Sequence, residues 1–207
     1  MPLSNSATEP ARRRGRPKIP KEVQRRRLLT AAGVAFDEQG YERTRVADIV
    51  AAAGMSSRSF YEFFDSKEDL IASVVSVAGK AVVARLREIL SETRDPVERI
   101  DRGLQLFLDL FSHLPVDLES LGGAAGREVR AARRDYLREA TQLVLGELIE
   151  GHKQGMIARK PDPVLVELVL TGVEGMAFRY YSESRQSELR ELHPVIRDLL
   201  FQALVGA

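Results

Sequence analysis

Two groups of residues near the N-terminus have the types and spacing needed to bind a polyanion. The first is the run Arg12-Arg13-Arg14-Gly15-Arg16-Pro17-Lys18, which is narrow, extended and positively charged. Such a strip fits an A·T-rich minor groove of DNA, where the negative potential is enhanced and arginine inserts readily. The alternative is a solvated basic tail that adds only nonspecific attraction to phosphate. A second DNA-binding element nearby favours the groove arm.

The second group lies in residues 44–67, where the spacing of apolar residues predicts two short helices. The first helix has apolar side chains at i, i+3, i+4 and i+7: Val46, Ile49, Val50 and Ala53. Thr44 stands just before this set as a candidate N-cap, and Gly54 ends the helix.

The second helix begins near Ser56 and Ser57, whose hydroxyls can cap its free amides. Its inward side chains are Phe60, Phe63 and Phe64, and its outward ones are Arg58, Ser59, Tyr61 and Glu62. Two helices joined by such a tight turn form a helix-turn-helix pattern, in which the second helix is the candidate reader of a DNA major groove.

The distribution of charge supports a polyanion at this end of the chain. The formal net charge is only +1, but residues 1–30 hold nine Lys and Arg against two Asp and Glu. Residues 31–70 hold four against eight, and residues 71–207 hold eighteen against twenty. The surplus positive charge is therefore confined to the N-terminus.

Other classes of function find little support in the composition. The absence of cysteine excludes disulfides, thiolate zinc sites and cysteine nucleophiles. The three histidines stand without an HExxH helix, a GxSxG elbow or a phosphate-binding glycine loop, so we expect no enzyme, no metal and no cofactor. No apolar leader and no charge-free run of 18 residues is present, and we expect a cytoplasmic protein that does not bind membranes.

The remainder of the chain predicts further helices and no strand, because every long apolar set has the helical period. A helix after Pro20 should end at Gly40, and residues 66–92 should form a rod about 39 Å long that could act as a mechanical link. Later helices are expected after Pro96, at residues 127–153 and 164–181, and after Pro194. The prediction is an all-α fold of about nine helices, and the 44% hydrophobic content is enough for a proper core.

Three segments are expected to have separate roles. Residues 1–19 should form a disordered basic arm and residues 20–66 the helix-turn-helix DNA-binding domain. Residues 67–207 should form a helical domain that binds an effector and dimerises.

The motif residues together closely resemble the tetracycline-repressor (TetR) family of bacterial regulators. The resemblance covers about residues 20–75 and lies in Phe36-Asp37-Glu38-Gln39-Gly40-Tyr41, Thr44, Val46, Asp48-Ile49, Ala53-Gly54-Met55-Ser56, Phe60-Tyr61, Phe64 and Ser66-Lys67-Glu68-Asp69-Leu70. The rest of the chain agrees with the family in length and helical character.

The resemblance implies a role for each matching position. Thr44 and Arg45 would open a helix over the DNA backbone, and Tyr61 and Lys67 would contact phosphates. The positive end of a helix dipole does not favour a lysine, which makes a phosphate partner for Lys67 more attractive.

Ser57, Arg58 and Ser59 would face base edges or nearby phosphates. Arg14 and Arg16 belong to the basic arm. Arg58 stands where many relatives have glycine. It could read guanine in bidentate fashion, worth about 1–3 kcal/mol of discrimination, or clamp a phosphate.

The expected function is that of a homodimeric repressor released from a palindromic operator on double-stranded DNA by an unknown small-molecule effector. Its two helix-turn-helix units would enter successive major grooves about 34–36 Å apart. An effector-independent DNA-binding or architectural protein, or an activator, is the alternative. A tightly packed body without a pocket would favour the architectural protein.

The predicted pocket and dimer interface lie in the later helices. Pocket candidates are Phe107, Phe111, His113, Tyr136, Glu174 and Phe178, although the aromatics could equally be core residues and Glu174 could pair with an arginine. Gly172 and Gly175 would allow close approach of the last two helices to a second subunit. The predicted interface residues are Val169, Val173, Ile196, Leu199, Leu200, Ala203 and Leu204.

Overall fold

The helices follow the order that the apolar spacing predicts. The computed structural model describes residues 19–111 and 121–205, and these ranges contain eight α-helices and no strand. The helices are α1 (Lys21–Gln39), α2 (Val46–Ala52), α3 (Ser57–Tyr61), α4 (Lys67–Glu92), α5 (Pro96–Phe111), α6 (Gly123–Lys153), α7 (Pro163–Ser182) and α8 (His193–Leu200). A 3-10 helix, Gln186–Leu192, precedes α8 and a π-helical turn, Phe201–Val205, follows it. The all-α prediction is confirmed.

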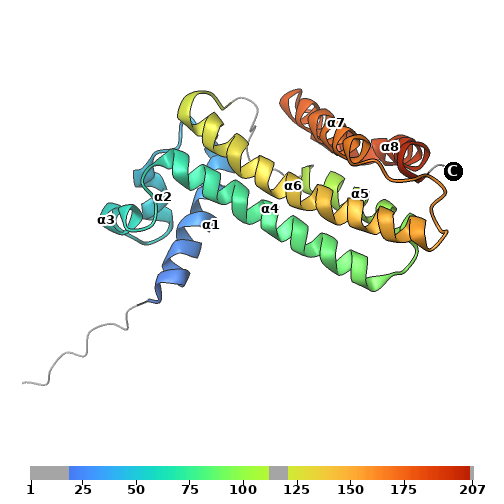
Figure 1. Cartoon of the computed structure of the whole chain (residues 1–207). Coiled ribbons are helices and arrows are strands. Elements are labelled where there is room, and N and C mark those ends of the chain that lie inside the picture. Colours follow the sequence, from blue (N-terminus) through green and yellow to red (C-terminus); the bar gives the residue numbers. More distant parts are fainter. Residues whose placement is uncertain (1–18, 112–120, 206–207) are drawn as a thin grey trace, which may run out of the picture.

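Helices α1 to α3 form a small head at one end of the molecule (Figure 1). Gly54 takes a φ of 65° after α2, a left-handed conformation that glycine adopts without steric cost. The chain then turns into α3, where the Ser56 hydroxyl accepts a hydrogen bond from the Ser59 amide at 3.2 Å. Ser56 is therefore the N-cap, as the sequence predicted, and the turn between the two helices stays short.

Helix α4 connects the head to the body, which comprises α5 to α8. It is 26 residues long, as predicted, and α6 runs beside it in the same direction away from the head (Figure 1). Ser66 caps α4 by accepting from the Asp69 amide at 3.1 Å, while the Asp69 carboxylate accepts from the Asp65 amide at 3.1 Å. Ser66 and Asp69 together accept hydrogen bonds from two amides at the start of α4.

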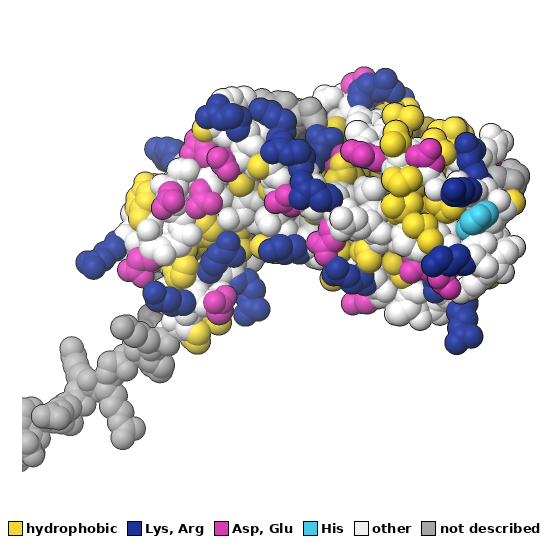
Figure 2. All heavy atoms as spheres, in the orientation of Figure 1, with side chains coloured by type: hydrophobic (Ala, Val, Ile, Leu, Met, Phe, Trp, Pro, Cys, Tyr) yellow, Lys and Arg dark blue, Asp and Glu magenta, His cyan; other side chains and the backbone are white. Residues whose placement is uncertain are grey.

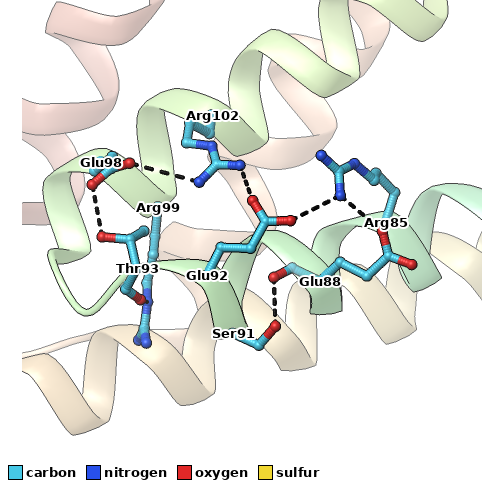
Figure 3. Close-up of polar contacts among 8 residues, drawn as sticks. All are labelled: Arg85, Glu88, Ser91, Glu92, Thr93, Glu98, Arg99 and Arg102. Carbon is cyan, nitrogen blue, oxygen red and sulfur yellow. Dashed lines mark hydrogen bonds and ion pairs between the residues drawn. The ribbon is translucent and has the colours of Figure 1, made fainter.

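The corner between α4 and α5 is held by charged side chains (Figure 3). Arg85 donates to Glu92 at 3.0 Å, and Glu92 also pairs with Arg102 across the corner. Asp95 caps α5 by accepting from the Val97 amide at 2.9 Å. The far end of α4 is consequently fixed to the body.

Buried side chains form two clusters. The first joins the head to the near ends of α4, α6 and α7, and includes Leu28, Phe36, Phe60, Leu70 and Phe178. The second fills the far part of the body and includes Leu104, Leu148, Val166, Ile196 and Leu200. Because α4 takes part in the first cluster, the head and the start of α4 pack as one unit.

Some segments differ from the expectation or lie outside the description. Helix α6 begins at Gly123, four residues before the predicted start, within a glycine-rich stretch. Residues 1–18 of the predicted arm, which was expected at residues 1–19, lie outside the described residues. Within those ranges, no helix combines the length and apolar character that crossing a membrane requires.

Candidate nucleic-acid interface and effector cavity

The outward side of α3 presents side chains that suit DNA binding. Ser57, Arg58 and Tyr61 are exposed, Tyr61 by 60%, and Ser59 is half-buried beside the cap. Phe60 is fully buried beneath them, with its ring 5.6 Å from that of Phe64. This packing fixes the rotation of α3, so the polar side chains point away from the core. Within the described residues, no ion pair or hydrogen bond engages the Arg58 guanidinium.

Arg45 occupies the N-cap position of α2, one residue later than predicted. Its amide donates to the Asp48 carboxylate at 2.9 Å, and its guanidinium lies 3.2 Å from the same group. The hydrogen bond from Arg45 lowers the pKa of Asp48 below its ordinary value. The Arg45 side chain nevertheless remains 79% exposed, which leaves it accessible to the DNA backbone.

The structure corrects the role predicted for the Thr44 side chain. Thr44 is fully buried, and the single proton of its hydroxyl is shared between the carbonyls of Gly40 at 2.8 Å and Ala35 at 3.1 Å. The side chain therefore neither caps α2 nor reaches the surface where DNA would lie. It ties the end of α1 to the start of α2, because buried carbonyls need a donor.

Lys67 connects the first turn of α4 to the loop between α1 and α2. Its ammonium donates to the carbonyls of Tyr41 at 2.9 Å and Thr44 at 3.0 Å, and lies 4.1 Å from the centre of the Tyr41 ring. Two of its three donors are thus occupied within the protein. A lysine at the positive end of a helix is stabilised here by carbonyls, so a phosphate is not needed to explain it.

A cavity of about 120 Å³ lies in the body between α4, α5, α6 and α7. Its wall is almost entirely aliphatic and aromatic, with Val82 and Leu86 from α4, Phe107 from α5 and Val144 from α6 among the lining residues. An apolar cavity of about 150 Å³ is large enough to hold benzene. The space therefore admits a small apolar group as it stands, and a larger molecule only if the wall moves.

The polar residues of the cavity wall are Arg99, Tyr136 and Glu147. Arg99 forms an ion pair with Glu147 and also donates to the Thr93 carbonyl at 2.7 Å. The Tyr136 hydroxyl donates to the Glu174 carboxylate at 2.8 Å. Since the two charged residues neutralise each other, the cavity offers no unbalanced charge to an ionic ligand.

The predicted pocket residues divide into those that line the cavity and those beside it. Phe107 and Tyr136 line the cavity. Glu174 is fully buried next to Tyr136 and is held by Arg133, whose guanidinium also lies 4.1 Å from the centre of the buried Phe178 ring. Glu174 pairs with an arginine, the alternative left open by the sequence. His113 lies outside the described residues, as does the side chain of Phe111.

Most of the residues predicted for the dimer interface face the interior of their own chain. Val173, Ile196, Leu200 and Leu204 are buried in the second cluster of their own chain, and Val169 and Ala203 are half-buried. Leu199 alone of the predicted set is exposed, by 58%. The opposite faces of α7 and α8 carry an exposed apolar stripe formed by Val164, Leu168, Val195 and Leu199.

This stripe belongs to the end of the molecule where Figure 2 shows hydrophobic side chains gathered over α7 and α8. Along α7 the exposed positions recur at helical spacing and include Thr171, Gly172 and Gly175. These small residues follow Val164 and Leu168 along the same exposed side of the helix and leave the backbone of α7 open to close approach. The apolar stripe is therefore a candidate contact surface for a second helix pair.

Residues 28–74 match the model of the bacterial regulatory proteins of the tetR family. This match covers the end of α1, the whole helix-turn-helix and the start of α4. The chain belongs to the TetR family. It is a DNA-binding transcriptional regulator and not an enzyme.

Two curated HTH-type relatives differ in the direction of their regulation. The chain is 25% identical over 158 residues to the transcriptional repressor KstR2 of Mycobacterium tuberculosis, an alignment that spans 74% of this chain and 79% of KstR2. It is 31% identical over 101 residues to the transcriptional activator FasR of Mycolicibacterium smegmatis, spanning 49% of this chain and 46% of FasR.

A solved structure shares the fold over most of its length. The regulator FadR from Bacillus subtilis in complex with stearoyl-CoA superposes with a TM-score of 0.68 at 18% identity, covering 88% of this chain and 98% of FadR. This likeness in fold covers the body as well as the head. In the described part of the chain, no group of three acidic or histidine side chains is placed to hold a metal ion.

Proposed function

We propose that this TetR-family regulator is a homodimeric repressor that an uncharged, mainly apolar small molecule releases from a palindromic operator. The observation that carries the proposal is the apolar cavity beside α4. A body that served only for dimerisation would not need such a space. The cavity therefore argues against the effector-independent architectural protein.

Helix α4 provides the physical route from the effector to the DNA. Val82, Leu86 and Leu90 of α4 line the cavity, while Lys67 at its other end is bonded to two carbonyls of the head. An effector that shifts α4 would change the separation of the two heads in the dimer. It must bind the DNA-incompetent separation better than the competent one, since equal affinity for both would shift nothing.

The exposed stripe on α7 and α8 supports the dimer. Val164 is 73% exposed, Leu168 67% and Val195 69% in the single chain. Covering these side chains with the same stripe of a second copy gives a twofold interface. Each head would then meet one half of a palindrome, with half-sites about 34–36 Å apart.

Several features support repression by an apolar effector. The match to the repressor KstR2 extends over most of both chains, whereas the match to the activator FasR covers about half. The complex of FadR with stearoyl-CoA is a precedent in the same fold for a ligand with a long apolar chain. In DNA binding we assign Arg45, Ser57, Arg58, Ser59 and Tyr61 to the interface, and Arg14 and Arg16 to a minor-groove arm.

The proposal is tested first by mapping the DNA sites that the protein binds across its genome. Bound sites should contain a palindrome with half-sites about one helical turn apart. Deleting the gene should raise transcription of the neighbouring genes, whereas a fall would identify an activator.

The effector response is tested on the mapped operator by fluorescence anisotropy, with n-decanol as an uncharged apolar probe. We expect n-decanol to weaken operator binding by about fivefold or more, and decanoate to act less because its charge must be buried. Binding of n-decanol, seen as a thermal shift, with no change in operator affinity would contradict the effector response.

A further inference from the structure

Tyr136 occupies a position where the cavity, α4 and α7 meet. It lies midway along α6, lines the cavity and contacts the first buried cluster, which extends into the head. Its hydroxyl reaches α7 at Glu174, and its ring lies on α4 at Gly79. Tyr136 therefore touches both the place where an effector would sit and the helix that would carry the response.

The contact with α4 is made directly against the helix backbone. A Cβ atom added to Gly79 would lie 2.5 Å from Cδ1, 2.6 Å from Cγ and 2.7 Å from Cβ of Tyr136. Real side chains do not approach so closely, so only glycine permits this packing. Because no side chain separates the ring from α4, a displacement of Tyr136 has no flexible group to absorb it.

The other end of the Tyr136 side chain is held in one position. Its hydroxyl donates to Glu174, which is fully buried and accepts two further hydrogen bonds from Arg133, at 2.9 and 3.0 Å. Burial and the neighbouring Glu174 raise the pKa of Tyr136 above its ordinary value, so the phenol stays protonated and remains a donor. The free space of about 120 Å³ is smaller than most ligands need, and a larger molecule must displace part of the wall.

A shift of α4 at Gly79 reaches the head through a continuous helix. Gly79 is twelve residues from Lys67, about 18 Å along the helix axis. Lys67 is bonded to the carbonyls of Tyr41 and Thr44 and therefore moves together with the loop between α1 and α2. We propose that Tyr136 is the positioning residue that transmits occupancy of the cavity to α4 through its contact with Gly79. This inference rests on the proposed ligand-responsive function.

The test introduces the displacement without a ligand. Gly79→Ala inserts a methyl group against the ring, and we expect it to lower operator affinity by about fivefold or more. Gly146→Ala is the matched control, because it adds a methyl group to α6 outside the cavity wall, where no atom lies within 4 Å of the added carbon. The control should change operator affinity by less than about twofold.

The double variant Gly79→Ala/Tyr136→Ala removes the clash and the contact together. We expect its operator affinity to return to within about threefold of the parent protein. It should still bind n-decanol, detected by a thermal shift, but n-decanol should no longer weaken operator binding. A merely structural role for Tyr136 would not separate ligand binding from operator release in this way.

Two results would overturn the inference. One is a folded Gly79→Ala variant with unchanged operator affinity. The other is a double variant from which n-decanol releases the operator as it does from the parent, and this result decides the matter even if Gly79→Ala does not fold. A third pattern separates this inference from the proposed function. If Gly79→Ala lowers operator affinity and the double variant restores it, the contact between Tyr136 and Gly79 is supported. If n-decanol at the same time leaves the operator affinity of the parent unchanged, the proposed effector response is contradicted.

Discussion

In the head, Thr44 and Lys67 direct a hydroxyl and an ammonium to backbone carbonyls, whereas the body surrounds a cavity with carbon atoms. The head is thereby held in one conformation, with exposed polar side chains arranged on its outer surface. The body retains an apolar space of about 120 Å³ that a ligand could fill. In the proposed mechanism both properties are used, because a fixed head would keep its specificity while filling the cavity of the body would change the spacing of the two heads.

The largest expected effect comes from separating the subunits. It tests whether the surface of the body matters as much for operator binding as the surface of the head. Leu168→Glu combined with Leu199→Glu places charges in the exposed apolar stripe. We expect monomers by light scattering and operator binding weaker by about 100-fold or more, because the second head loses its effective concentration. Val77→Glu on α4, where the valine is 47% exposed, is the control. A dimer that persists in the Leu168→Glu/Leu199→Glu variant would show that the interface lies elsewhere.

The next effect concerns the outer surface of the head. Arg58→Ala should weaken operator binding by about 5- to 150-fold, the equivalent of 1–3 kcal/mol. A relaxed preference at one base pair would indicate base recognition, and a salt slope lower by about one would indicate a phosphate contact. Lys160→Ala removes the same charge from an exposed position beyond α6 and should leave binding unchanged. If both variants lost the same operator affinity, Arg58 would contribute only through its charge and not through a specific contact.

A smaller effect is expected from the interior of the head. Thr44→Val keeps the volume but removes the hydroxyl that serves the carbonyls of Ala35 and Gly40. The free energy of unfolding should fall by about 1–3 kcal/mol, measured by urea denaturation. Ser57→Ala, at an exposed position, is the control. If the two variants were equally stable, the buried hydrogen bonds would not be what holds the head rigid.

The smallest effect is expected at the charged corner of the body. Hydrogen bonds from Arg102 and Arg85 lower the pKa of Glu92, so its ionised form is favoured in the folded state. The ionised Glu92 side chain therefore stabilises the folded protein at pH values above the pKa that the carboxyl has in the unfolded chain. This stabilisation is lost as the pH falls through the lower pKa of the folded state. Glu92→Gln should therefore have a slightly lower melting temperature than the parent protein at pH 7. At acidic pH the two melting temperatures should lie closer together. A constant difference across the titration would exclude the ion pairs as its cause.

The sequence was more informative about the head than about the body. The helix-turn-helix could be predicted because its caps, glycine and apolar spacing lie within about twenty-five residues of one another. The error at Thr44 arose because its partner Ala35 lies nine residues earlier, beyond the turn. For Lys67 the available signal was its unfavourable place at a helix N-terminus, which called for acceptors without identifying them.

The body's helices could be located, but the sides they bury could not. Helix α7 is apolar almost all round, so spacing alone cannot distinguish the face carrying Val173 from the face carrying Leu168. The packing of Tyr136 on Gly79 joins residues 57 positions apart, and the paired charges of Arg133 and Glu174 are likewise distant in sequence. Such contacts depend on how helices pack in three dimensions, which local periodicity does not determine.

The central claim is that cavity occupancy and operator binding oppose each other. Calorimetric titration of n-decanol into the protein, free and saturated with operator, tests it most directly, because coupling between two sites must be reciprocal. We predict that operator-bound protein binds n-decanol more weakly, by the same factor by which n-decanol weakens operator binding. Equal affinity for n-decanol in the free and operator-bound protein would contradict the account.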